Sequence, residues 1–500
     1  MKKWKKTIYI VLSVLLWIGL WTYFAYRLNK PVLLPYPGAV FRTFFKLLTG
    51  KEFLPILWGS FTHIAKGFLC ALVLGTVLAV AASTGEPIAI LLMPGVKLVK
   101  TVPVASFIIL LLFFVEPAEI GFVISLLMVF PVVYENVYKG ISSADRKLIE
   151  AAEVFRVGWW KRLTRLYIPA SVPYALAACS AGLGLCWKAG VAAELIAQAP
   201  KSIGRELYYA KLYVDAEGVF AWTILIVLVS VLFEKLFLTL FRLLTVAFSA
   251  PTLWYSPKKL LCYVLGIRSR AGRLEEAEAV REETEIGSLA QESLERREIC
   301  TLSGVSKGFE GNDVLKEVNL SLCTGEVFLI TGPSGAGKTT LLRLLMGLEK
   351  PDGGTVTIAD SVRIAAVFQE NRLCEQLSAL QNVRLTARPC TKAMAASLLT
   401  FSGIEPAPGK AVGTYSGGMQ RRVAWCRALA AESELVILDE PFTGLDEEKK
   451  LRMLRLLYER KRSNAIVIVT HNASEMERIR ETFENVRMYT LSDQTLYEKD

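Results

Sequence analysis

Histidine is nearly missing from this 500-residue sequence, which contains only His63 and His471. The nine cysteines are scattered, and they form no C-x-x-C pair and no cluster with a histidine. A structural zinc site needs several such ligands at short spacing, so we expect none here. Cysteines used in this way are typical of reduced thiols that pack inside a protein.

Acidic residues are scarce in the first half of the chain. Residues 1–250 contain 25 Lys+Arg and 13 Asp+Glu, whereas residues 251–500 contain 33 and 34. The basic residues flank apolar runs and have no DNA- or RNA-reading motif beside them, so we expect no nucleic acid partner. Hydrophobic residues make up 53% of a chain too long for one compact domain. The sequence therefore predicts a membrane part joined to a cytosolic part.

Six apolar runs in the first half are long enough to cross ~30 Å of hydrocarbon as helices. The first follows the basic head KKWKK and has no small-residue cleavage site, which predicts an uncleaved span with a cytosolic N-terminus. Six spans place both ends of this region in the cytosol. The other five runs lie at about 62–83, 88–115, 118–137, 174–197 and 219–247.

The distribution of basic residues supports this orientation only in part. The N-terminal cluster and the basic loop at 146–165 agree with an excess of positive charge on the cytosolic side. The loop between the first two spans, placed outside, is also basic and contains Arg27, Lys30, Arg42, Lys46 and Lys51.

Two ionisable residues, Lys188 and Glu194, fall within the fifth span. Exposure of a charge to lipid costs several kcal/mol, so such residues are candidates for a substrate path. The alternatives are a side chain that reaches the interface or a structural hydrogen bond to another helix. Both interpretations stay open on the sequence alone.

The second half opens with a polar stretch at 251–298 that we interpret as a linker. From Ile299 onward, short β-branched runs alternate with helical patterns, which predicts an α/β fold with a parallel sheet. One apolar strand leads into GPSGAGKTT at 332–340, where a helix begins. Backbone N–H groups and the helix N-terminus favour a phosphate chain there. The predicted phosphate loop consists of Gly332, Pro333, Ser334, Gly335, Ala336, Gly337, Lys338, Thr339 and Thr340.

Specific roles follow for residues of this loop and of two later strands. Lys338 would reach the outer phosphates and Thr339 would bind Mg²⁺. The strand LVILDEP ends in Asp439, placed to hold Mg²⁺, and the next residue, Glu440, could polarise the attacking water. A third strand ends near His471, which we expect at the γ-phosphate.

A second glycine motif, YSGGMQRR, contains Ser416, Gly417 and Gly418 directly before a helix. Alone, this serine would be interpreted as an ordinary helix cap. One nucleotide rarely needs two phosphate cradles, so the second cradle could serve a nucleotide that another copy of the chain holds.

Together these motifs resemble the ATPase of ATP-binding cassette (ABC) transporters over about residues 299–490. The resemblance identifies 332–340 as Walker A, 415–421 as the signature motif, LVILDE as Walker B and His471 as the switch histidine. It further implies that Gln369 is the Q-loop residue, with catalytic and Mg²⁺ contacts, that Asp446 belongs to the D-loop, and that Phe309 stacks on adenine. ATP and Mg²⁺ are the implied cofactors. Tyr415 and Met419 depart from the usual leucine and glutamine of the signature.

The first half resembles permeases of type I ABC importers, in the nitrate, sulfonate and taurine group, over about residues 30–248. Glu150-Ala151-Ala152 and Ile168-Pro169 match the cytosolic E-A-A loop of such permeases. The match implies a coupling helix whose apolar side, Leu148, Ala152 and Phe155, docks on the ATPase near Gln369 while its charges stay in water. An ordinary interfacial amphipathic helix is the alternative.

We therefore expect a multi-domain chain: an all-α six-span permease at 1–250, a linker at 251–298 and an α/β P-loop ATPase at 299–500. The resemblance implies ATP-driven import of a small, anionic solute across the bacterial cytoplasmic membrane, with the ATPase in the cytosol. It also implies a homodimer and a separate extracytoplasmic solute-binding protein. An ABC exporter, or an ATP-gated signalling or mechanical membrane protein, are the alternatives.

Overall fold

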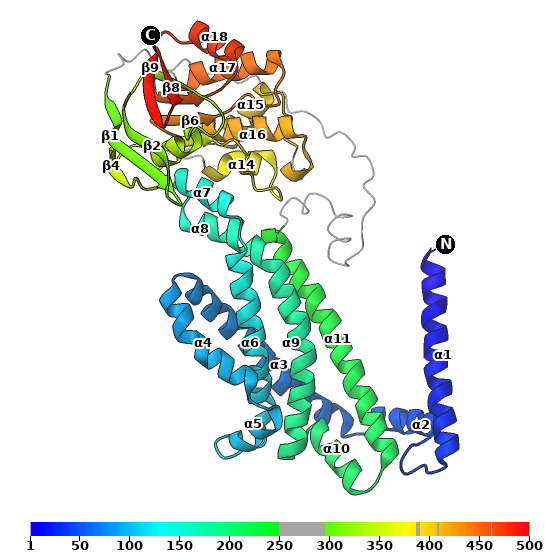
Figure 1. Cartoon of the computed structure of the whole chain (residues 1–500). Coiled ribbons are helices and arrows are strands. Elements are labelled where there is room, and N and C mark those ends of the chain that lie inside the picture. The colour runs from blue at the N-terminus through cyan, green and yellow to red at the C-terminus, as the bar shows by residue number, and fades with distance from the viewer. Residues whose placement is uncertain (1, 250–295, 387–390, 408–409, 462, 500) are drawn as a thin grey trace. The chain divides into compact units, whose positions relative to one another are not determined.

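The computed structural model describes residues 2–249, 296–386, 391–407, 410–461 and 463–499 (Figure 1). Most of the predicted linker at 251–298 lies outside these residues. Contacts divide the chain into two units. The first comprises Met1–Ser143 and Ala170–Thr245, and the second comprises Ala144–Pro169 and Val246–Asp500. The loop with the E-A-A motif thus groups with the C-terminal unit.

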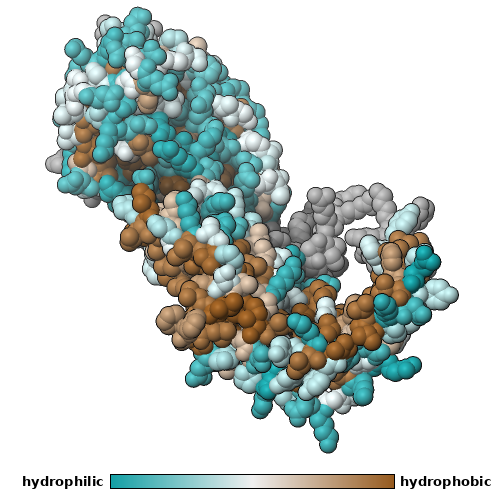
Figure 2. All heavy atoms as spheres, turned by 60° about the horizontal axis from the view of Figure 1, so that its bottom comes forward, coloured by the Kyte–Doolittle hydropathy of each residue, from teal (hydrophilic) through white to brown (hydrophobic). Residues whose placement is uncertain are grey.

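The first unit consists of helices. Helices α3, α4, α6, α9 and α11 contribute to one apolar cluster that contains Phe68, Val133 and Trp187. Figure 2 shows apolar side chains on the outer faces of this unit, as expected of helices that meet lipid. The helices are α1 (Lys2–Leu28), α2 (Pro37–Leu48), α3 (Phe53–Ser83), α4 (Glu86–Thr101), α5 (Val104–Leu111), α6 (Ile120–Ser142), α9 (Ile168–Ala197), α10 (Ile203–Leu212) and α11 (Ala216–Ser249).

Helices α3 and α6 approach each other closely because glycine stands at their contact. A Cβ on Gly67 would lie 2.4 Å from the Phe122 carbonyl oxygen, and one on Gly75 would lie 2.9 Å from the Val133 Cβ. Lipid tails are as apolar as the helices, so no hydrophobic effect drives helices together in a membrane. Their association therefore depends on such close packing.

Five helices in the described residues are long and apolar enough to span a membrane, and a bent pair would make a sixth. The prediction of one continuous span at 88–115 is wrong, because α4 and α5 meet at 101°. The break falls at Val102-Pro103: Val102 is extended (φ −69°, ψ 130°), as the ring of a following proline requires. The other predicted spans match long helices, with ends that differ by several residues.

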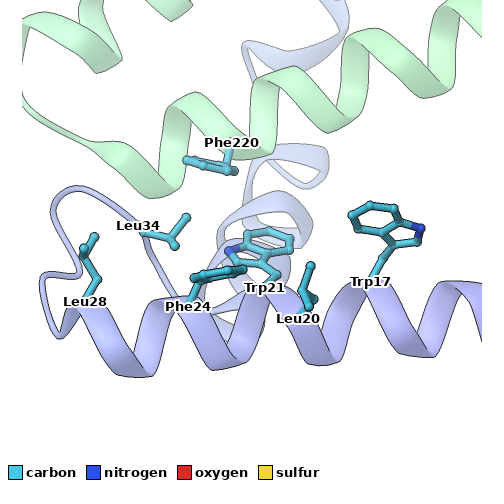
Figure 3. A pocket seen from close by; sticks show the side chains of 7 residues that line it. All are labelled: Trp17, Leu20, Trp21, Phe24, Leu28, Leu34 and Phe220. Carbon is cyan, nitrogen blue, oxygen red and sulfur yellow. The ribbon is translucent and has the colours of Figure 1, made fainter.

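A pocket of about 460 Å³ lies between α1 and α11 in the first unit (Figure 3). The Trp21 ring stacks on the Phe220 ring at 5.5 Å, and the Trp21 indole N–H donates to the Pro35 carbonyl oxygen at 3.1 Å. The lining is almost entirely apolar and comprises Trp17, Leu20, Trp21, Phe24, Leu28, Leu34 and Phe220.

The second unit is built on two sheets. A three-stranded antiparallel sheet has the order β2-β1-β4, and a six-stranded sheet has the order β5-β6-β7-β3-β8-β9, parallel except for β9. The strands are β1 (Glu298–Phe309), β2 (Asn312–Cys323), β3 (Val327–Thr331), β4 (Gly353–Ile358), β5 (Ile364–Val367), β6 (Leu435–Asp439), β7 (Ala465–Val469), β8 (Val486–Ser492) and β9 (Thr495–Lys499).

Continuous apolar runs become buried parallel strands in this unit. Every residue of β6 and β7 is buried, since both faces of the sheet are covered by the domain. The helices are α13 (Lys338–Leu345), α14 (Ala379–Thr386), α15 (Lys392–Phe401), α16 (Gly417–Ala430), α17 (Glu447–Lys461) and α18 (Ala473–Thr482). This confirms the predicted fold classes: a helical N-terminal region followed by an α/β domain.

Candidate functional site

The predicted nucleotide residues gather at one edge of the six-stranded sheet. The phosphate loop follows β3, Gln369 follows β5 by two residues, Asp439 ends β6, and His471 follows β7 by two residues. Because β5, β6, β7 and β3 are consecutive neighbours in the sheet, their carboxyl ends lie side by side. Open α/β sheets bind ligands at this edge.

The loop between β3 and α13 has the backbone that a phosphate cradle requires. Gly332, Gly335 and Gly337 have φ values of 148°, 82° and 97°, which favour glycine. The Lys338 ammonium donates to the carbonyl oxygens of Gly332 (2.8 Å) and Pro333 (2.7 Å), so it lies over the loop. Thr339 and Thr340 occupy the first turn of α13. The backbone N–H groups of this glycine-rich loop, a helix N-terminus and the Lys338 ammonium fit a polyphosphate.

The carboxyl end of β6 carries the acidic pair. Asp439 is 6% exposed, and burial raises the pKa of its carboxyl to about 6, while the charges of Arg421 and Lys338 act against this. A buried carboxylate supplies hard oxygen ligands, which suit Mg²⁺. No group of three His, Cys, Asp or Glu side chains assembles in the described residues.

Glu440 and His471 lie together at this edge. His471 Nδ1 is 3.3 Å from Glu440 Oε1, and the His471 side chain is 72% exposed. Glu440 has φ 44°, a left-handed backbone that non-glycine residues rarely adopt. Such conformations persist where surrounding contacts hold them, and they gather at functional sites.

Three further predicted residues, Ser416, Asp446 and Phe309, are exposed. Ser416 caps α16, and its Oγ accepts from the Met419 N–H at 3.4 Å, so the capping role exists in this structure. Asp446 accepts from the Lys449 N–H at 3.0 Å. Phe309 ends β1 with 46% of its surface exposed, which leaves its ring accessible.

The segment Ala144–Pro169, here called the docking segment, packs against the ATPase core. It contains α7 (Arg146–Val154), α8 (Trp159–Arg162) and a π-helical turn, Leu163–Tyr167. Ala152 and Phe155 are buried in the same apolar cluster as the sheet, and Leu148 packs on it. The predicted apolar docking side is confirmed.

The prediction that the charges of this segment stay in water is wrong for Glu150. Its side chain is 14% exposed, and its Oε2 lies 3.1 Å from Arg343 Nη1 and 2.9 Å from Arg372 Nη1. The hydrogen bond from Arg343 is the main cause that lowers the pKa of Glu150. Arg343 is on α13, the helix that starts at Lys338, so one carboxylate joins the docking segment to the phosphate-loop helix.

Sequence reasoning missed three buried arginines on α16: Arg421, Arg422 and Arg427. Burial lowers the pKa of Arg421, and it lowers the pKa of Arg427 to about 10. A buried guanidinium must find acceptors, and these donate mainly to backbone carbonyl oxygens. The signal in the sequence was the density of arginine in YSGGMQRRVAWCRALA, whose helix is buried at every position from Arg421 to Ala430.

The two ionisable residues of α9 have different surroundings. Glu194 is 2% exposed, and its Oε2 accepts from Ser60 Oγ at 2.7 Å and from the Gly204 N–H at 3.3 Å. This is the structural hydrogen bond that the sequence left open. Lys188 is exposed on the surface of the first unit.

Comparisons with known proteins agree with these observations. The family model described as "ABC transporter" matches residues 315–443, and the model described as "Binding-protein-dependent transport system inner membrane component" matches residues 71–248. The aliphatic sulfonates import ATP-binding protein SsuB 1 of Nocardia farcinica is 40% identical over 184 residues, which cover 36% of this chain and 74% of that protein.

Two further relatives share the ATPase region. The Fe(3+) ions import ATP-binding protein FbpC 1 of Rhodococcus jostii is 37% identical over 191 residues, covering 35% of this chain and 55% of that protein. A solved dimeric ATP-binding cassette with ADP and Pi is 27% identical, with a TM-score of 0.36, covering 40% of this chain and 98% of that one.

The phosphate loop, the acidic strand end, the helical first unit and these matches lead to one assignment. The chain belongs to the ABC transporter family: it joins a transport-system inner membrane component to an ABC ATPase, which binds ATP with Mg²⁺ and couples its hydrolysis to transport.

Proposed function

We propose that two copies of this chain form an importer that takes up a small anionic solute from a separate extracytoplasmic binding protein. The observation that carries this proposal is the docking segment, whose E-A-A carboxylate contacts the phosphate-loop helix. Relatives that share the ATPase region carry import in their names, for aliphatic sulfonates and for Fe(3+). The solutes in these names differ, so similarity of the ATPase does not identify the solute of this chain. The preference for an anion rests on Lys188.

We assign the residues of each ATPase as follows. The phosphate loop and Lys338 bind the phosphates, Phe309 stacks on the base, and Thr339, Gln369 and Asp439 hold Mg²⁺, which offsets phosphate charge when bound. Glu440 orients and deprotonates the attacking water, and His471 contacts the γ-phosphate.

The second glycine motif serves the other copy. Ser416, Gly417 and Gly418 of one copy would close on the nucleotide that Lys338 of its twin binds, with Asp446 at the same interface. A head-to-tail dimer with two such sites explains why one chain contains two phosphate cradles. Closure would move the docking segment, and hydrolysis would reset it.

The orientation follows from this arrangement. The ATPase and the docking segment would lie in the cytosol and the helices of the first unit in the bacterial cytoplasmic membrane, where the dimer also forms through the permease.

The test is Glu440→Gln in the full chain in lipid nanodiscs. We expect ATP binding to persist while the hydrolysis rate falls at least ~100-fold, the range of a general base. Wild-type turnover in this variant would remove the assigned base. Solute uptake into right-side-out vesicles, compared with inverted ones, measures direction, and accumulation in inverted vesicles alone would identify an exporter.

A further inference from the structure

Arg421 stands inside the ATPase at the point where three of its motifs meet. Its side chain belongs to α16, the signature helix, and the residue is 3% exposed. A guanidinium has five N–H bonds in a planar fork. Five of its acceptors are backbone carbonyl oxygens: Nε donates to Pro441 (3.2 Å), Nη1 to Phe368 (2.5 Å) and Gln369 (3.1 Å), and Nη2 to Asp439 (2.9 Å) and Glu440. Nη1 also lies 3.5 Å from the side-chain oxygen Oδ1 of Asn371.

These carbonyls belong to two strands that have just separated. The ladder between β5 and β6 runs from Ile364 with Leu435 to Val367 with Leu438 and then ends. The next residues on each strand are Phe368 and Asp439, and Arg421 donates to both. Beyond the end of the backbone ladder between β5 and β6, the Arg421 guanidinium therefore links the two segments by side-chain hydrogen bonds.

Hydrogen bonds hold the backbone of Glu440 on both sides of its Cα atom. Its N–H donates to the Val469 carbonyl oxygen of β7 at 3.0 Å, and its carbonyl oxygen accepts from Arg421. The left-handed φ of 44° at Glu440 costs about 1–2 kcal/mol for a residue with a Cβ. Such a backbone stays in place only while neighbouring contacts hold it.

We propose that Arg421 is a positioning residue for ATP hydrolysis, which holds the peptide of Glu440 against the loop of Gln369 and so aims the Glu440 carboxylate. The proposal rests on the roles proposed above for Glu440 and Gln369. Arg421 acts mainly through backbone carbonyl oxygens of this site. It also joins the signature helix to both strands, so these three elements move together.

Arg427 provides a matched control on the same helix. It is also 3% exposed and donates to the carbonyl oxygens of Arg372 (2.5 Å) and Asn371 (3.3 Å). Its guanidinium carbon lies 5.1 Å from the ring of Phe155 in the docking segment. Arg427 thus holds the far end of the same loop, and no hydrogen bond from it to residues 439–441 occurs among the described residues.

The experiment uses the full chain in lipid nanodiscs and compares Arg421→Lys, Arg421→Gln and Arg427→Lys. Lysine keeps the charge but offers three donors from one point, which cannot span both strands. We expect the kcat of each Arg421 variant to fall about 10- to 100-fold, because a misplacement near 1 Å can cost ~100-fold. The Kd for ATP and the number of nucleotides bound should stay within about threefold, and Arg427→Lys should keep kcat within about threefold.

A double-mutant cycle separates positioning from general damage. If Arg421 acts through Glu440, Arg421→Lys adds no further loss of single-turnover rate in a Glu440→Gln background. Any of three results would overturn the proposal. These are wild-type kcat in both Arg421 variants, the same fold loss of rate in the wild-type and Glu440→Gln backgrounds, and a rate loss that follows from lost ATP binding. If Arg421→Gln does not fold, Arg421→Lys carries the test. Wild-type turnover in Glu440→Gln alone is a separate result, which rejects the proposed base instead.

Discussion

Removal of the Glu150 carboxylate should weaken the packing of the docking segment on the ATPase far more than removal of the nearby Lys147 ammonium. Glu150→Gln keeps the shape but offers Arg343 and Arg372, whose side chains are 24% and 14% exposed, one neutral oxygen in place of the carboxylate. Arg343 keeps its ion pair with Glu349 at 3.2 Å. Hydrogen bonds between charged groups contribute about 1.5–3 kcal/mol each, and the amide retains part of one. We expect the segment to lose roughly 2–3 kcal/mol of docking free energy, equal to about 30- to 150-fold in its opening constant.

The assay is hydrogen exchange of the backbone amides in Arg146–Val154, which reports that opening constant. Lys147→Gln is the matched control, because its ion pair with Glu370 has a comparable N···O distance of 2.6 Å but side chains that are 55% and 58% exposed. Such a surface pair contributes about 0–1 kcal/mol. Equal effects of the two substitutions would refute the argument that burial decides the strength of this contact.

Acid gives an independent view of the same contact. Hydrogen bonding from Arg343 lowers the folded-state pKa of Glu150 below its ordinary 4.5. A depressed carboxyl pKa contributes stability above the unfolded value, and this stability is lost as pH falls through the folded value. Protection of the docking segment should therefore decline below about pH 4.5 in the wild type, and Glu150→Gln should lack this part of the decline.

Three further substitutions, two of them with a matched control, test the backbone and the packing. Gly337→Ala places a side chain at φ 97° and 2.8 Å from a valine methyl of β2, so ATP affinity should fall over tenfold by equilibrium binding. Gly335→Ala, with open space around it, should cost less. Gly67→Leu should separate α3 from α6 and lower the melting temperature, whereas Gly95→Leu, with nothing within 4 Å of its Cβ position, should not. Asn382→Ala leaves the Cys374 N–H and three carbonyls without their buried partner, and chemical denaturation should show a loss of about 2 kcal/mol.

Local patterns in the sequence predicted the strands that the candidate site residues follow. The runs before the phosphate loop, Asp439 and His471 were predicted as apolar strands. The structure forms these three strands as neighbours in one parallel sheet, so their carboxyl ends share one edge. The glycines of 332–337 are required by local backbone geometry, which a short motif specifies. Pro103 is also present in the sequence. The mean hydropathy of a long window does not register a single proline, so the bend between α4 and α5 was missed.

The sequence alone determined the two fold classes, the phosphate loop and the apolar side of the docking segment, because these depend on periodicity and on residues near one another in the chain. Only the tertiary structure decided that Glu150 is buried between two arginines and that Arg421 spans two strands. Those contacts join residues 193, 222 and about 20 to 50 positions apart, and a charge shows its partner only once the chain has brought that partner within hydrogen-bond distance.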